Sequence, residues 1–142
     1  MAPSHYELIN HTSDVGVRVW GATPEDLFCH AAEAMLDILM DGWATAVKGT
    51  GHRVTVDAED IERLLVKWLQ HLIYEFDTKR MVPSSFKITE CFPTRLKADI
   101  TYAQFDPSQH HMKTELKAVT YHQLSVRQTS PHRWKAQVIF DV

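Results

Sequence analysis

The sequence predicts a single α+β domain in which a mixed, mostly antiparallel sheet is covered on one face by two amphipathic helices. Three observations predict it. The chain has 142 residues, which is the length of one domain. Two segments carry apolar residues at helical spacing, and several others alternate apolar and polar residues as half-buried strands do. The late strands follow one another through short polar turns, which favours antiparallel pairing.

The first elements in the chain are a strand and a helix. Residues 15–20 alternate valines with Gly, Arg and Trp, so they predict a strand with one buried face. Thr23 is a good N-cap and Pro24 suits the first helical position. Apolar residues then recur at helical spacing, and we expect this helix to end near Met40.

The middle of the chain predicts a loop, a short strand and a longer helix. Residues 42–51 are the best candidate for a long surface loop, and residues 53–57 alternate as a strand. The second helix begins near Asp60 and carries a wide apolar stripe as far as Phe76. Trp68 lies within this stripe, so we expect it in the core.

The remainder of the chain predicts strands joined by turns. One turn is expected over residues 91–94, and a solvated loop that includes His110 and His111 over residues 106–111. The expected strands cover residues 88–92, 95–102, 116–121, 124–127 and 134–141.

Composition narrows the class of protein. The chain carries 15 Lys and Arg against 18 Asp and Glu, a net charge of −3, so we expect no strong direct nucleic-acid binding. No apolar run reaches the length of a membrane span. The first residues have no signal-peptide pattern, and Cys29 and Cys91 lie far apart, so we expect a cytoplasmic protein with two reduced thiols.

Two segments are candidates for metal chemistry. Asp14 ends a polar segment, residues 11–14, that directly precedes the first predicted strand and suits a nucleophile, a base or a metal ligand. At the other end, an alternating strand runs to Asp141, whose carboxylate then lies beside the terminal carboxylate of Val142. Adjacent carboxylates repel, and a hard divalent cation relieves the repulsion. The alternatives are a polar loop that caps its own backbone and a terminal Asp that faces water.

A third candidate is the polar strand over residues 113–122, which contains Lys117 and His122. It suits a recognition surface or an acid–base cluster, and the alternative is a surface strand with cross-strand ion pairs. The nine histidines are scattered without zinc-site spacing, and the chain contains no phosphate-binding glycine motif.

Four blocks of sequence, in order along nearly the whole chain, resemble the archease family. They are the opening YELINHTSDVG (6–16), LLVKWL with LIYEFD (64–69 and 72–77), KAVTYH (117–122) and the ending FDV (140–142). The resemblance implies a small accessory protein that is not itself an enzyme. Such a protein activates an RtcB-type RNA ligase in tRNA splicing and RNA repair, by promoting guanylylation of the ligase and multiple turnover.

The resemblance also implies a divalent cation, which we expect to be calcium, with magnesium or manganese as alternatives; GTP is used by the ligase. The matching positions are Asp14, Asp141 and Val142, the carboxylates already singled out. We expect such a site to place a metal at the ligase centre, where the phosphates of GTP need charge neutralisation.

The expected ligase-docking residues are His11, Lys117 and His122. Three positions depart from the family pattern. Asn10 replaces a usual acid, so one negative charge is missing if that position contributes to the metal site. Gln123 stands where Gly is frequent, and Ser13 replaces a common Ala.

Two other functions stay open. One is a chaperone or modulator of another RNA-processing enzyme, such as a tRNA methyltransferase, which would use the same surface without a catalytic metal. The other is a stand-alone metal-dependent hydrolase. A hydrolase needs a pocket with a nucleophile or an activated water, and no such constellation is recognisable in the sequence.

Overall fold

The computed structural model describes residues 5–10, 14–44 and 49–142 of the chain. Within them two helices and nine strands follow one another, and every paired strand is antiparallel. In chain order the elements are β1 (Tyr6–Asn10), β2 (Asp14–Gly21), α1 (Pro24–Leu39), β3 (Met40–Asp41), β4 (Thr50–Asp57), α2 (Ile61–Lys79), β5 (Met81–Phe92), β6 (Arg95–Gln104), β7 (His111–Met112), β8 (Ala118–Ser130) and β9 (Arg133–Asp141).

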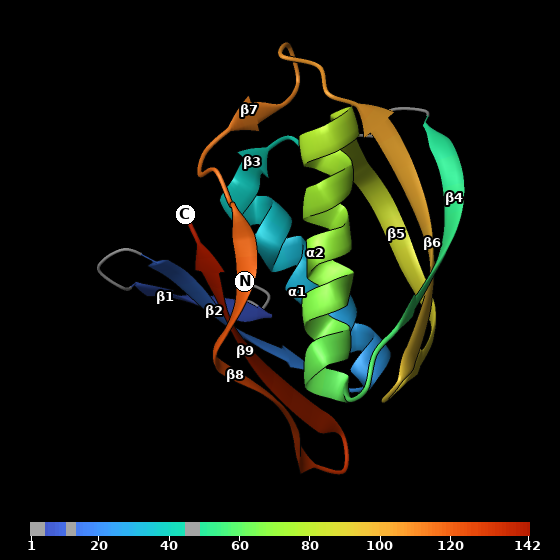
Figure 1. Cartoon of the computed structure of the whole chain (residues 1–142), viewed down its shortest axis with the longest axis vertical. Helices are drawn as coiled ribbons and strands as arrows, with labels where there is room; N and C mark the ends of the chain where they lie inside the picture. The colour runs from blue at the N-terminus through green and yellow to red at the C-terminus, as the bar shows by residue number, and fades with distance from the viewer. Residues whose placement is uncertain (1–4, 11–13, 45–48) are drawn as a thin grey trace.

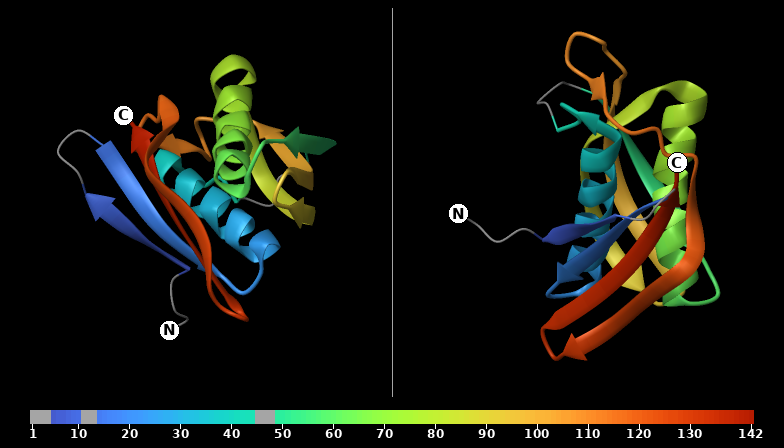
Figure 2. Two further views of the ribbon diagram at one scale, coloured as in Figure 1. Left: turned by 60° about the horizontal axis from the view of Figure 1, so that its bottom comes forward. Right: turned by 90° about the vertical axis from the view of Figure 1, so that its left-hand side faces the viewer.

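The strands form two larger sheets and one short ribbon. One sheet has the order β1-β2-β9-β8, the other β4-β6-β5, and β3 pairs with β7. Both helices lie between the two larger sheets: α1 contacts β2 and β5, and α2 contacts β8 and β5 (Figures 1 and 2). The predicted α+β class with antiparallel pairing is confirmed. The helices cover the inner faces of two sheets, where the sequence had suggested a single sheet.

The helix boundaries follow their capping residues. The side chain of Thr23 accepts the backbone N–H of Asp26 at the start of α1, as the sequence predicts. Asp60 caps α2 in the same way, by accepting the backbone N–H of Arg63. The second helix continues one turn beyond the predicted apolar stripe and ends where Arg80 adopts a left-handed conformation.

The core lies where the helices meet both sheets. Trp68 is fully buried, and its indole N–H donates to the carbonyl oxygen of Phe28, 3.1 Å away, so it joins the two helices. The expectation that Trp68 is a core residue is therefore confirmed. Phe140 is also fully buried, so the end of the last strand packs against the helices. The C-terminus is thus a paired and packed strand end.

Two differences from the predicted elements matter for the site. The segments expected as two strands over residues 116–121 and 124–127 belong to the single strand β8, whose register against β9 shifts between Thr120 and Ser125. Residues 6–10 form an additional edge strand, β1, paired with β2. Alternation did not reveal β1, because an edge strand at the rim of a core need not alternate regularly.

His110 was expected in a solvated loop, and this is wrong. Its exposed fraction is 2%, and its Nδ1 accepts the backbone N–H of Asp106 at 2.9 Å. The ring also packs at 5.6 Å from that of Phe105. A tight turn over Asp106–His110 folds the imidazole inward, which sequence polarity alone does not indicate.

Candidate functional site

The two aspartates singled out in the sequence are cross-strand partners. Asp14 is the first residue of β2 and Asp141 the last of β9, and the antiparallel register places them directly opposite each other. In the same row, Asp141 also pairs with Ala118 of β8. Side chains opposite each other point to the same face, with Cβ atoms about 5 Å apart. Two carboxylates separated by 126 residues in the chain are therefore brought together as one pair.

The carboxylates lie on the face of the sheet that turns away from the helices. Their neighbours Val15 and Phe140 are also paired and point the other way, and Phe140 is fully buried against the helices. Asp141 is exposed, Asp14 is partly exposed, and Val142 is 37% exposed. The site is thus an exposed, acidic end of the sheet, close to the C-terminus (Figure 1).

On the same face of the sheet, the row of residues next to the carboxylates is apolar. Gly16 pairs with Ile9 on one side and Ile139 on the other. A Cβ on Gly16 would lie 2.7 Å from Cδ1 of Ile139 and 3.2 Å from Cβ of Ile9, so glycine is what allows the two isoleucines to close over this position. Ile139 is fully buried as a result, although it is on the outer face.

The donor set suits a hard divalent cation. In residues 5–10, 14–44 and 49–142, no three His, Cys, Asp or Glu side chains come together as metal ligands. The candidate donors are the side chains of Asp14 and Asp141, which are cross-strand partners, and the terminal carboxylate of Val142, which follows Asp141 in the chain. Calcium takes six to eight oxygen ligands and magnesium six, many of them carboxylates. Three carboxylates fit this chemistry but do not complete it, so further oxygens from water or a partner are needed.

The expected docking residues are placed unequally. The backbone N–H of Lys117 donates to the carbonyl oxygen of Asp141 at 2.8 Å, so Lys117 adjoins the carboxylate pair. His122 is exposed and lies four residues further along β8 from Ala118, in the irregular segment where the register shifts. His11 lies outside the described residues, as do Thr12 and Ser13 of the same motif.

The bulge of β8 gives residue 123 a backbone conformation that suits glycine. Gln123 has φ of 53°, in the left-handed region that glycine adopts without steric cost. Its carbonyl oxygen accepts from the side-chain amide of Gln137 at 3.1 Å, which fixes the bulge to β9. Glycine would adopt this left-handed conformation without strain, whereas Gln123 adopts it at a conformational cost.

Sequence reasoning missed one residue that holds β8 in place. The side-chain oxygen of Gln70 on α2 accepts the backbone N–H of Val119 at 3.1 Å. Val119 follows Ala118, which is in the row of the carboxylate pair. In the sequence, the only sign of this role is that the polar Gln70 lies among the apolar residues of α2. This sign is weak, because polar residues of a helix also face solvent.

The fold and the paired carboxylates define a small α+β protein with an acidic sheet end. The model of the archease protein family matches residues 6–142. Archeases from Methanosarcina acetivorans and Pyrococcus furiosus are 35% and 33% identical to the chain, over 96% and 97% of it and 95% and 96% of those proteins. The chain belongs to the archease family.

Solved structures agree with the assignment. The solution structure of Methanobacterium thermoautotrophicum protein 1598 is 28% identical, with a TM-score of 0.76, and covers 99% of this chain and 100% of its own. The crystal structure of an archease from Thermotoga maritima has a TM-score of 0.64 at 21% identity, with 94% of each chain covered, and shows the same fold. In the described part of this chain, no helix combines the length and apolar character that a membrane crossing requires.

Proposed function

We propose that this archease is a non-catalytic accessory protein that activates an RtcB-type RNA ligase in tRNA splicing and RNA repair. The observation that supports the proposal is the direct pairing of Asp14 with Asp141 beside the terminal carboxylate. Two motifs that carry the family resemblance, one at each end of the chain, meet in this pair. This proximity is expected if the carboxylate pair is the functional site.

The carboxylates of Asp14, Asp141 and Val142 hold a divalent cation in this proposal. We expect calcium, with magnesium or manganese as alternatives, because all three prefer carboxylate oxygens. A bound cation would supply positive charge that balances the phosphates of GTP in the ligase. The protein fixes two of its carboxylates through the β2–β9 ladder, and the exposed position leaves the opposite side open to the partner.

The partner ligase docks over the same end of the sheet. Lys117 adjoins Asp141 and is exposed, so its ammonium group is available to an acidic group on the partner. His122 extends the surface along β8. The net charge of −3 favours association with a basic, RNA-binding enzyme. GTP is consumed by the ligase and needs no site on this chain.

A ligase turnover assay tests the proposal. The ligase, GTP, divalent metal and excess RNA ends are incubated with substoichiometric wild-type protein or with Asp141→Asn. The matched control is Asp99→Asn, an isosteric change on the outer face of β6 in the other sheet. We expect many joined ends per ligase with wild type and with the control, and few with Asp141→Asn.

The other outcomes separate the alternatives. Stimulation that survives Asp141→Asn keeps the ligase as partner and refutes the metal mechanism. If correctly folded wild-type protein does not stimulate its cognate ligase, the activator proposal is wrong. A pull-down that then recovers a tRNA methyltransferase would support the chaperone or modulator function instead.

A further inference from the structure

The hairpin of β8 and β9 is a cationic element on an acidic protein. The segment from Leu116 to Phe140 holds β8 and all of β9 except its last residue, Asp141; it contains four Lys and Arg residues and no Asp or Glu. The rest of the chain therefore holds 11 of the 15 basic residues and all 18 acidic ones. Overall charge conceals this separation, because the hairpin is positive while the remainder is strongly negative.

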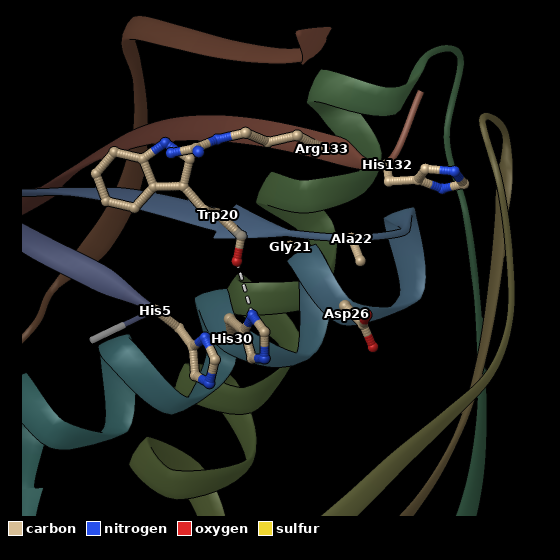
Figure 3. A pocket seen from close by; sticks show the side chains of 8 residues that line it. All are labelled: His5, Trp20, Gly21, Ala22, Asp26, His30, His132 and Arg133. Atoms are coloured by element: carbon tan, nitrogen blue, oxygen red, sulfur yellow. Dashed lines mark hydrogen bonds between the residues drawn. The ribbon is translucent and has the colours of Figure 1, made fainter. Parts of the chain in front are cut away.

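Three of these cations gather on the open face of the sheet, beside an aromatic ring. Trp20 pairs with Lys135, and Lys135 pairs with Arg127, so the three form one row across β2, β9 and β8. The ammonium group of Lys135 lies 5.8 Å from the centroid of the Trp20 ring. The guanidinium carbon of Arg133 lies 5.9 Å from the same ring, and Figure 3 shows the two side chains one over the other.

These cations have no anionic partner in the part of the chain that the structure describes. Among the described residues, Arg127, Arg133 and Lys135 take part in no ion pair, whereas Arg18 on the same face is bound to Glu7 at 2.7 Å. Arg127 and Arg133 are exposed, and Lys135 is partly exposed. Unneutralised cations around an aromatic ring are arranged to meet an external polyanion.

A cavity of about 510 Å³ adjoins the ring. Three imidazoles and one guanidinium line it, from His5, His30, His132 and Arg133, together with one acid, Asp26. The rings of His5 and His30 are stacked with centroids 3.9 Å apart. His30 donates its Nδ1–H to the carbonyl oxygen of Trp20 at 2.7 Å (Figure 3). Such a lining offers hydrogen-bonding groups to a nucleobase or a phosphate.

We infer that this face, formed by Trp20, Arg127, Arg133 and Lys135, binds single-stranded RNA. Cations along a groove contact phosphates, and bases stack on an aromatic ring or on a guanidinium plane. Trp20, with the guanidinium group of Arg133 over its ring, supplies both kinds of surface. An acidic protein segment would need the charges but not the aromatic ring. A lipid surface would need apolar side chains at the hairpin tip, which is instead Thr129, Ser130, Pro131 and His132.

The RNA face lies at the opposite end of the β2–β9 ladder from the carboxylates. Trp20 lies six positions along β2 from Asp14, which corresponds to about 20 Å along the strand. RNA held at the cationic end is thereby kept away from the acidic end, whose charge would repel it. The inference concerns this chain alone and does not depend on the proposed activation of a ligase.

Fluorescence anisotropy of a labelled, unstructured RNA dodecamer with the isolated chain tests the inference. Three phosphate contacts predict a slope of log K against log[salt] of about −2. The combined variant R127Q/R133Q/K135Q should bind at least about tenfold more weakly, with a slope near zero. Its matched control, R53Q/K87Q/R95Q, removes the same charge from the other sheet and should bind as wild type does.

The contribution of the Trp20 ring is tested separately from that of the three cationic side chains. Trp20→Leu should weaken binding by about tenfold, whereas Trp20→Phe, which keeps a ring, should bind nearly as wild type does. Circular dichroism confirms that each variant is folded. The inference is overturned if the control triple loses as much affinity as the hairpin triple, or if Trp20→Leu binds as tightly as Trp20→Phe. It is also overturned if a polyglutamate peptide competes as well as RNA.

Discussion

Replacing Asp141 by Asn should stabilise the metal-free protein and abolish its stabilisation by calcium. Asp141 faces Asp14 directly across the β2–β9 ladder. Like charges in this position are destabilising, by about 0.5–1 kcal/mol on an exposed face where solvent screens them. Asn is nearly isosteric and removes one of the two charges. For a chain of this length, we expect the melting temperature in chelator to rise by about 2–3 °C.

Calcium should stabilise wild type strongly and Asp141→Asn only weakly. At about one hundred times its dissociation constant, a ligand that binds only the folded state adds about 2.7 kcal/mol, which is about 5–10 °C in melting temperature for wild type. Asp141→Asn should lose most of this shift, because one of the three carboxylates is gone.

Thermal melting followed by circular dichroism, in chelator and across a calcium series, measures both effects. The control Asp99→Asn removes a charge that is paired with Arg53 at 3.1 Å, so it should not stabilise the protein and should keep the calcium shift. The reasoning is refuted if Asp141→Asn melts below wild type in chelator, or if calcium stabilises it as much as wild type.

Three further predictions concern the rest of the molecule. Gln123→Gly should raise the free energy of unfolding by about 1 kcal/mol, because glycine adopts a φ of 53° without the steric cost; denaturant titration that shows a loss of stability would contradict this. Burial raises the pKa of the Cys29 and Cys91 thiols to about 12, so both should react slowly with a thiol reagent at about pH 8 until the protein is unfolded; rapid labelling of the native chain would show that burial does not protect them. Burial lowers the pKa of His71 and His110, so below about pH 6.5 the unfolded chain binds more protons than the folded one. The free energy of unfolding should therefore fall as the pH drops below this value. His71→Gln should flatten the dependence of melting temperature on pH, and an unchanged slope would contradict the assignment.

The helices could be predicted from sequence because their signals are local. Thr23 caps the first helix as expected, the second helix begins next to Asp60 as expected, and the apolar stripes mark which side of each helix is buried. The buried indole of Trp68 follows from the same periodicity. Local capping and spacing decide these features, so a single sequence contains them.

The sheet arrangement could not be predicted in the same way. Alternation marks a strand but does not say which strand it pairs with, so the division into two sheets on either side of the helices came only from the structure. For the same reason, the sequence flagged Asp14 and Asp141 separately, and only the register shows that they face each other. The inward turn of His110 likewise depends on packing against Phe105, which is a tertiary contact.

The most direct test of the central claim is the rate at which the partner ligase becomes guanylylated. Ligase that has completed one round of joining is mixed with radiolabelled GTP, divalent metal and this protein, and covalent label on the ligase is followed in time. The account predicts rapid relabelling with wild-type protein and slow relabelling with Asp141→Asn. Equal rates with wild type, with Asp141→Asn and with no added protein would contradict the claim that this acidic sheet end activates the ligase.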